Sequence, residues 1–356
     1  MTQPQKENLP IVDSHLDLAE NVTLFGYDLT LTIAERRARE NRSERQATVS
    51  LPELERGGIA VAIATVTAGF LAADVGEDFE PRSALYRTAE EAEAQALRQI
   101  DLYERWEQQG RVRLIKSRAD LDDHLRLWQR DRRPGLVLLM EGADPIVHVR
   151  DLPRWWQRGL RVIGLTYGDT KYGVGVASGS AQVRPGGLTQ EGVAIMERMA
   201  EIGFLWDISH LAEAGVWQGL EMQYPYVCAS HANARALTPT DRHLSDAVIR
   251  ALSQRGGVIG MVLYNAFLEP RWRRDKTIRV TLEDHLRRQA NHIASTGGWG
   301  CLGIGSDLDG GLGLEESPVE INTIADLRKV GAVVPEHARE AVLSTNWLNF
   351  LRRSLP

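Results

Sequence analysis

Side chains that can bind metal ions or move protons stand at the ends of apolar runs in this chain. His15 and Asp17 lie two residues apart at the end of the first run, so in a strand both side chains point to one face. Four later runs end in Glu141, His210, His231 and Asp307. A lone histidine at a strand end is more often a packed core residue than a ligand, but together these residues form the donor set of a metal site.

This donor set predicts two bound divalent metal ions. Burying carboxylates and imidazoles without a compensating charge costs on the order of several kcal/mol per unpaired ion, and divalent cations would offset that cost. Because the ligands are imidazoles and carboxylates without a thiolate, Zn²⁺ is the expected metal.

The elements that must position these side chains are short runs of apolar and β-branched residues. They cover residues 11–18, 59–68, 135–144, 161–168, 203–210, 226–232, 256–264 and 301–310. Near-continuous apolar runs are typical of strands buried on both faces, which occur in parallel sheets covered by helices.

Stretches with helical periodicity separate several of these runs. Residues 83–109 carry apolar side chains at spacings of three and four, and residues 189–203, 245–256 and 281–296 show similar patterns. Eight strands alternating with helices predict an α/β fold, a (β/α)8 TIM-type barrel with extra loops and helices, whose active site lies at the carboxyl ends of the strands. An open doubly wound sheet is the alternative.

Composition supports a globular enzyme of small molecules. The chain has 356 residues, 43% of them hydrophobic, and 42 Lys and Arg against 48 Asp and Glu give a net charge of −6. No linker, repeat or charged block divides it, so we expect one domain over residues 1–356 with a core of about 11–351. Without a basic cluster or a run of about 18 apolar residues, neither nucleic acid nor a membrane span is expected.

The two cysteines and the chain ends complete these expectations. Cys228 and Cys301 are too few and too far apart for a disulfide framework, and we predict two buried free thiols. Neither end carries the pattern of a signal peptide or a lipid anchor, which makes the cytoplasm the expected compartment.

A series of motifs follows in order along the chain: DSHLD, MEG, LTY, DISH, ASHANAR, a DR pair, GIGSDLDG and NWLNFL. In this order they resemble the membrane (renal) dipeptidases, a branch of the amidohydrolase superfamily, over roughly Ile11 to Leu351. The resemblance implies that His15 and Asp17 bind one zinc ion. It implies that His210 and His231 bind the other, with Glu141 bridging both. It also implies that Asp307 handles the proton of the bridging water and that Arg242 binds the terminal carboxylate of the substrate.

One position departs from the family pattern. Tyr167 follows Leu-Thr where the dipeptidases have a histidine close to the reacting carbonyl. A phenol with a pKa of about 10 can donate a hydrogen bond to a developing oxyanion but adds no positive charge. Tyr167 is therefore predicted to bind substrate in this way, and an aromatic wall at the barrel mouth is the alternative.

Other polar residues are weaker candidates for the site. We expect His124 and His337 to be exposed, His148 and His243 to be minor candidates for the pocket wall, Asp13 and Asp309 to orient ligands, and Asp207 to face away from His210.

The function predicted from these residues is zinc-dependent hydrolysis of the peptide bond of small dipeptides by a metal-bridging hydroxide. The implied partner is a small substrate with a free carboxylate, including dipeptides with a C-terminal D-residue, and the resemblance allows a homodimer. Two alternatives remain open. The same centre acts on an N-acyl amino acid or a related amide or ester, which Tyr167 favours, or the chain binds metal and ligand without turnover.

Overall fold

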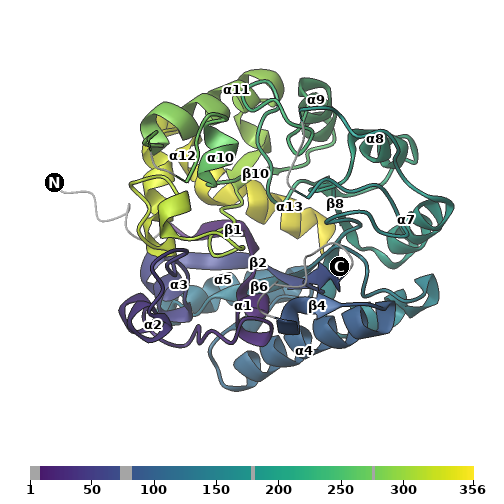
Figure 1. Cartoon of the computed structure of the whole chain (residues 1–356), viewed down its shortest axis with the longest axis horizontal. Helices are drawn as coiled ribbons and strands as arrows, with labels where there is room; N and C mark the ends of the chain where they lie inside the picture. The colour runs from purple at the N-terminus through teal and green to yellow at the C-terminus, as the bar shows by residue number, and fades with distance from the viewer. Residues whose placement is uncertain (1–8, 73–81, 178–180, 275–276) are drawn as a thin grey trace.

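Eight parallel strands run through the middle of the molecule (Figure 1). The structure is a computed structural model that describes residues 9–72, 82–177, 181–274 and 277–356. The strands are β1 (Ile11–Leu16), β2 (Ile59–Thr67), β6 (Gly135–Glu141), β7 (Leu160–Gly164), β8 (Leu205–Asp207), β9 (Val227–Cys228), β10 (Ile259–Met261) and β11 (Leu302–Ile304). Their hydrogen-bonded order is β10-β11-β1-β2-β6-β7-β8-β9.

The two ends of this order meet, so the sheet closes into a barrel. Ala229, which follows β9, forms a parallel bridge with Ile259 of β10. The Ala229 N–H donates to the Val258 carbonyl at 2.9 Å, and the Gly260 N–H donates to the Ala229 carbonyl at 2.9 Å. The predicted (β/α)8 barrel is confirmed, and the open sheet is wrong.

The barrel strands are buried on both faces, which is why their sequences read as continuous apolar runs. In β2, Val61 and Ile63 belong to one apolar cluster while Ala62 and Ala64 belong to another. The first cluster also contains apolar side chains of the C-terminal helix: Trp347, Leu348, Phe350 and Leu351. Packing therefore fixes the register of each strand, because a shift by one residue would exchange the two faces.

Helices surround the strands (Figure 1). Their bounds are α1 (Leu18–Thr23), α2 (Ile33–Glu40), α3 (Leu51–Gly57), α4 (Ala89–Gln108), α5 (Arg118–Asp131), α6 (Leu152–Gln157), α7 (Gln190–Ile202), α8 (Glu213–Glu221), α9 (Asp246–Gln254), α10 (Asn265–Leu268), α11 (Arg287–Gly297), α12 (Glu336–Glu340) and α13 (Asn346–Ser354). Short strands add to this frame: β5 (Arg113–Leu114) pairs with β6, and β3 (Phe70–Leu71) pairs with β4 (Leu85–Tyr86).

The predicted helices are present with one shifted start. The helix expected over 83–109 begins at Ala89, because Thr88 caps it by accepting from the Glu91 N–H and the preceding Leu85–Tyr86 pairs as β4. The helix expected over 281–296 opens with a π-helical turn, Leu282–Leu286, before α11. Both cysteines are buried free thiols, as predicted. Across the described part of the chain, no helix combines the length and hydrophobicity needed to cross a bilayer.

Candidate metal centre and active site

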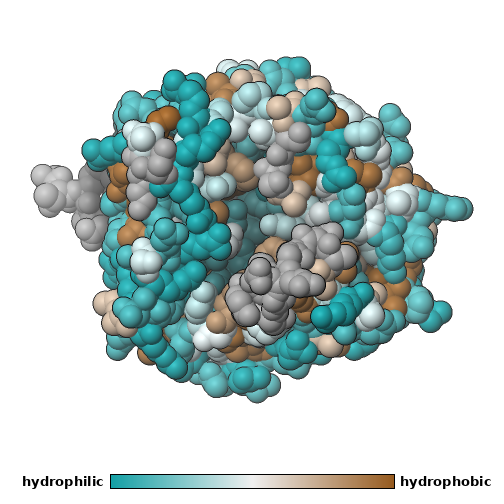
Figure 2. Space-filling model, in the orientation of Figure 1, coloured by the Kyte–Doolittle hydropathy of each residue, from teal (hydrophilic) through white to brown (hydrophobic). Residues whose placement is uncertain are grey.

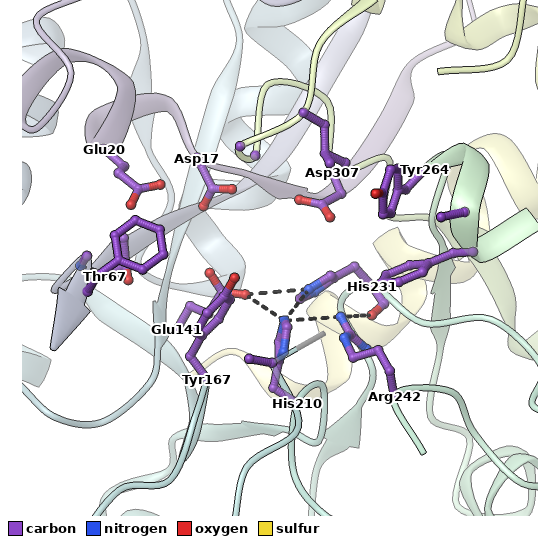
Figure 3. A pocket seen from close by; sticks show the side chains of 18 of the residues that line it. Asp17, Glu20, Thr67, Glu141, Tyr167, His210, His231, Arg242, Tyr264 and Asp307 are labelled. Carbon is purple, nitrogen blue, oxygen red and sulfur yellow. Dashed lines mark hydrogen bonds and ion pairs between the residues drawn. The ribbon is translucent and has the colours of Figure 1, made fainter. Parts of the chain in front are cut away.

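Three histidines and a glutamate from different strands meet at the carboxyl ends of the barrel (Figure 3). Glu141 Oε1 lies 3.4 Å from His15 Nε2, 3.2 Å from His210 Nε2 and 3.5 Å from His231 Nε2. Asp17 Oδ1 lies 3.8 Å from His15 Nε2. The structure thus brings together the five side chains that the sequence singles out as metal ligands.

Ser230 fixes two of the imidazole rings. Its Oγ lies 3.1 Å from His15 Nδ1 and 2.9 Å from His231 Nδ1, and its own hydroxyl donates to Asp207 Oδ2. Because a hydroxyl has one donor and two acceptor positions, both rings donate their Nδ1–H to Ser230. Their Nε2 lone pairs then face Glu141.

The third ring is held in the same tautomer by the backbone. His210 Nδ1 lies 2.9 Å from the carbonyl oxygen of Val176, which can only accept, so His210 Nε2 carries a lone pair. That lone pair faces His231 Nε2 at 2.8 Å. Two lone pairs at this distance repel one another unless a cation lies between them or beside them. The arrangement fits bound metal, whose histidine ligands donate their other ring N–H to an oxygen.

Burial shifts the pKa values of this cluster toward the neutral forms. It lowers the pKa of His15 to about 4 and that of His210 and His231 well below the usual value. It raises the pKa of Asp17 to about 8, with the charge of Glu141 adding to the effect, and it also raises the pKa of Glu141. Neutral imidazoles are the form that binds metal, and buried carboxylates need a cation to stay ionised.

Asp307 completes a second group of potential ligands. Ligand atoms of His15, Asp17 and Asp307 all lie within 4.8 Å of one another, as do those of His15, Glu141 and His231. Asp307 has φ +62°, a left-handed backbone conformation that few residues with a side chain adopt. Gly310 leaves the space that the carboxylates use, since a Cβ there would come closer than 3.0 Å to oxygens of Asp307 and Asp17.

Arg242 reaches the cluster from the loop before α9. It is 3% exposed, and its Nη2 lies 3.1 Å from His210 Nε2 and 3.1 Å from the His231 carbonyl oxygen. Its Nε and Nη1 are buried and find no hydrogen-bond partner within the described residues. Arg242 also lines the cavity beside the cluster, where a guanidinium can pair with an anionic group.

A cavity of about 400 Å³ opens over these residues. It is lined by Asp17, Glu141, Tyr167, His210, His231, Arg242 and Asp307, together with Glu20 and Tyr264. The molecule is hollowed near the middle of the face in view in Figure 2. Tyr167 is 38% exposed, and its ring centroid lies 4.6 Å from that of His210. Its phenol therefore borders the open space beside the cluster.

The comparisons with known proteins identify the family of this chain. The profile of the membrane dipeptidase family, peptidase family M19, matches residues 3–353. The chain belongs to this family. By that membership it is a metal-dependent dipeptidase.

Sequence relatives of this family member are distant. An uncharacterised protein of Klebsiella pneumoniae is 29% identical over 68% of this chain and 89% of its own length. Dipeptidase tcpJ of Claviceps purpurea is 26% identical over 70% of this chain, and an uncharacterised dipeptidase of Schizosaccharomyces pombe is 27% identical over 53%. The matches span only 55% and 45% of those two dipeptidases.

Solved structures share the fold of this family member over nearly its full length. A metallo peptidase from Rhodobacter sphaeroides, liganded with a phosphinate mimic of the dipeptide L-Ala-D-Ala, superposes with a TM-score of 0.77 at 22% identity and covers 98% of this chain and 99% of its own. A second M19 dipeptidase superposes with a TM-score of 0.76 at 22% identity.

Several secondary expectations for this dipeptidase family member need correction. His124 is not exposed: it is 2% exposed, and its Nε2 lies 2.8 Å from the Ala60 carbonyl oxygen. His148 is exposed and does not line the cavity, whereas His243 is buried against Phe267 beside a smaller cavity. Asp207 does not stand apart from the cluster, because β8 ends at this residue and its carboxylate accepts from Ser230.

Asp13 and Asp309 support the site from outside. Asp13 accepts from the N–H of Ser306 at 2.8 Å and from its hydroxyl, which ties β1 to the segment before Asp307. Asp309 accepts from Arg36 Nη1 at 2.8 Å and from the Thr48 N–H at 2.7 Å, which fixes the loop after β11. Both aspartates hold backbone that carries proposed ligands.

The sequence did not point to four residues of this site. Ser230, Gly310, Glu20 and Tyr264 contact the cluster or line the cavity. The sequence could have indicated Ser230, because it immediately precedes His231, and Gly310, because it is the last residue of the SDLDG motif. Glu20 and Tyr264 have no such signal, because their positions depend on how short segments after β1 and β10 turn back over the barrel mouth.

Proposed function

We propose that this protein hydrolyses the peptide bond of small dipeptides that carry a free carboxylate, with two zinc ions as its cofactor. One observation carries the proposal: the Nε2 lone pairs of His15, His210 and His231 all point to one oxygen of Glu141, while their Nδ1–H groups are occupied elsewhere. His15 and Asp17 would hold one ion, and His210 and His231 the other. Glu141 would contact both.

When bound, a pair of divalent ions lowers the pKa of a water molecule and polarises the scissile carbonyl. The chain supplies the remaining chemistry. Asp307 accepts the proton of the attacking water and returns it to the leaving amine, since its carboxylate lies among the proposed ligands and burial raises its pKa well above the usual value. A raised pKa makes a carboxylate a better proton carrier near neutral pH.

Two residues position the substrate in this proposal. Arg242, which lines the cavity, binds the terminal carboxylate with its guanidinium. Tyr167 donates its phenol to the developing oxyanion in place of the family histidine. Burial raises the pKa of Tyr167, so the phenol keeps its proton over the working range of pH.

The substrate class follows from the relatives and the site together. The Rhodobacter sphaeroides peptidase is liganded with a mimic of L-Ala-D-Ala, and in this chain Arg242 lines the cavity where a C-terminal carboxylate of either hand would lie. We propose small dipeptides, including those with a C-terminal D-residue. A second candidate is an N-acyl amino acid, which has the same carboxylate, and the observation in its favour is Tyr167.

Because the proposed ligands and the proton carrier come from β1, β6 and the segments after β8, β9 and β11, we also propose that residues 1–356 act as one catalytic domain. These residues span most of the chain, from His15 to Asp307.

Metal analysis combined with a substrate panel tests this function. The purified protein, loaded with zinc and desalted, should hold two equivalents per chain by mass spectrometry of the metal and should cleave dipeptides faster than N-acyl amino acids. Preference for the acylated substrates would establish the second candidate, and bound metal without any turnover would refute both.

Replacing the proposed proton carrier separates binding from chemistry. Asp307→Asn should keep most of the zinc and lose dipeptide turnover by about 10²-fold or more, in the range of general acid–base catalysis. Rates are measured by ninhydrin or coupled amino-acid detection. Turnover retained by Asp307→Asn would overturn the role of Asp307.

A further inference from the structure

Glu20 is a carboxylate in the cavity wall that the proposed reaction does not use. Glu20 lies on the short helix α1, three residues after Asp17, whose side chain also lines the cavity. Figure 3 shows Glu20 on one side of the cavity and Arg242 on the other, with Glu141, His210 and His231 between them.

The backbone around Glu20 is held firmly. The N–H of the preceding Ala19 donates to the Tyr103 hydroxyl at 3.0 Å, and that hydroxyl donates to the Thr65 carbonyl at 2.8 Å. The following Asn21 donates from Nδ2 to the Asp17 carbonyl at 2.8 Å and to the Asp309 carbonyl at 3.0 Å. These contacts hold the backbone that carries Glu20 at the cavity wall.

The Glu20 carboxylate has no compensating charge. Within the described residues it forms no hydrogen bond or ion pair, and Arg242 is the one lysine or arginine that lines the cavity there. Burial and the nearby charges of Asp17 and Glu141 raise the pKa of Glu20 well above its usual value. Among the described residues the Glu20 carboxylate thus has no basic partner, and a cationic group on a bound substrate would supply one.

The surroundings of Glu20 fit a long side chain with a charged end. Phe25 and Phe70 are half-buried and line the cavity together with Thr67 and Gly69. Lysine and arginine side chains pack their methylene groups against apolar surface and keep the charge at a polar tip. An α-ammonium group does not need this space, because it is two bonds from the scissile carbonyl and stays beside the ligand cluster.

On the basis of the proposed function, we infer that Glu20 determines specificity by binding a cationic side chain, that of lysine, ornithine or arginine, on the N-terminal residue of the dipeptide. The substrate then lies between two charges of opposite sign. Its C-terminal carboxylate contacts Arg242, its peptide bond lies at the cluster, and its N-terminal side chain reaches Glu20.

A pair of substrates that differ only in the ammonium group tests this role. Lys-Ala and norleucyl-Ala have the same side-chain carbons, and the zinc-loaded wild type should cleave Lys-Ala with a kcat/KM at least about tenfold higher, as expected for a charge-assisted contact. Glu20→Gln should bring this ratio close to one. Glu197→Gln, an exposed change on α7 away from the cavity, should keep the wild-type ratio.

Binding gives a readout that does not depend on turnover. Phosphinate analogues of Lys-Ala and norleucyl-Ala, titrated calorimetrically into the wild type, should differ in affinity by a similar factor, and Glu20→Gln should remove the difference. Should Glu20→Gln fail to fold, judged by its thermal midpoint, the wild-type series of Lys, ornithine, Arg, norleucine and Glu at the N-terminal position still decides the question.

The possible failures are distinct. Equal kcat/KM for Lys-Ala and norleucyl-Ala in the wild type overturns the role of Glu20. An equal loss on both substrates in Glu20→Gln also overturns it, because Glu20 would then act on the α-ammonium group or on the cluster. If the wild type cleaves no dipeptide and binds neither analogue, the proposed function itself fails.

Discussion

The hydroxyl of Ser230 contacts two of the proposed ligands at once. It accepts from His15 Nδ1 and His231 Nδ1 and donates to Asp207, so one side chain sets the tautomer of a ligand for each of the two proposed ions. Residues that orient metal ligands in this way are commonly worth 10- to 100-fold in metal affinity or activity.

Ser230→Ala should therefore lower zinc affinity by about 10- to 100-fold, since both rings lose the acceptor that fixes them. The affinity is measured by competition with a chromogenic chelator. Ser209→Ala is the matched control, because Ser209 also donates to Asp207, at 2.8 Å, but touches neither imidazole nitrogen. Equal zinc affinity in the two variants would show that Ser230 does not orient the ligands.

At the scale of single residues, the sequence gives residue types but not the contacts between them. His15, Glu141, His210 and His231 could be chosen because each follows an apolar run. Asp207 was misjudged, because alternation along a strand says nothing beyond the residue where the strand ends. His124 was misjudged because a helix with charged neighbours still turns one side toward the barrel.

At the scale of elements, the loop after β11 depends on one position that has no side chain. Gly310 stands where a Cβ would meet the carboxylates of both Asp307 and Asp17. Asp307 and Asp309 both have positive φ, so the loop makes a tight turn, which the contacts of Asp309 with Arg36 and Thr48 hold in place.

Gly310→Ala should displace Asp307 and Asp17 and lower dipeptide turnover by about 10²-fold, as small misplacements of catalytic groups do. Steady-state rates and zinc content measure the effect. Gly300→Ala is the control, because no atom lies within 4 Å of a Cβ built there. Full activity of the Gly310 variant would mean that the loop relaxes at no cost to the site.

The barrel could be predicted because the same local pattern, a short apolar run, recurs at each of its strands. Each strand buries both faces, so each appears as an apolar run that needs no partner to be recognised. The start of α4 was not predictable in this way. Leu85 and Tyr86 continue the apolar pattern of the helix, and only their pairing with Phe70 and Leu71, distant in sequence, makes them a strand.

Helix α5 contributes a pH-dependent contact to the barrel. His124 is buried, its Nε2 contacts the Ala60 carbonyl on β2, and burial lowers its pKa to about 4. In the unfolded chain its pKa is the ordinary 6.5. The unfolded state therefore binds more protons between these values, and the contribution of His124 to stability, complete above pH 6.5, is lost as the pH falls toward 4.

The loss should amount to about 3 kcal/mol across this window. His124→Gln should unfold in urea with a stability that falls less steeply between pH 6.5 and pH 4 than that of the wild type. His337→Gln, on an exposed residue of α12, should follow the wild-type profile. Parallel profiles for all three proteins would contradict a buried neutral His124.

At the scale of the whole molecule, the cluster joins parts of the chain that are far apart. Its proposed ligands come from β1, β6 and the segments after β8 and β9, and Asp307 follows β11. Metal bound there would link strands around the circumference of the barrel. Without it, the buried carboxylates of Asp17, Glu141 and Asp307 lose the positive charge that offsets their burial.

Removing metal should therefore destabilise the entire fold. A ligand that binds only the folded state stabilises it by RT ln(1 + [L]/Kd), about 4 kcal/mol at a thousandfold excess over Kd, so chelated protein should unfold at a temperature several degrees below that of zinc-loaded protein. Calorimetry with and without added zinc measures the shift. Glu141→Gln removes the negative charge that all three histidines face, so zinc should move its unfolding temperature much less. A wild-type unfolding temperature that does not change with zinc would contradict metal binding at this cluster, whereas an equal shift in the Glu141 variant would place the bound zinc elsewhere in the molecule.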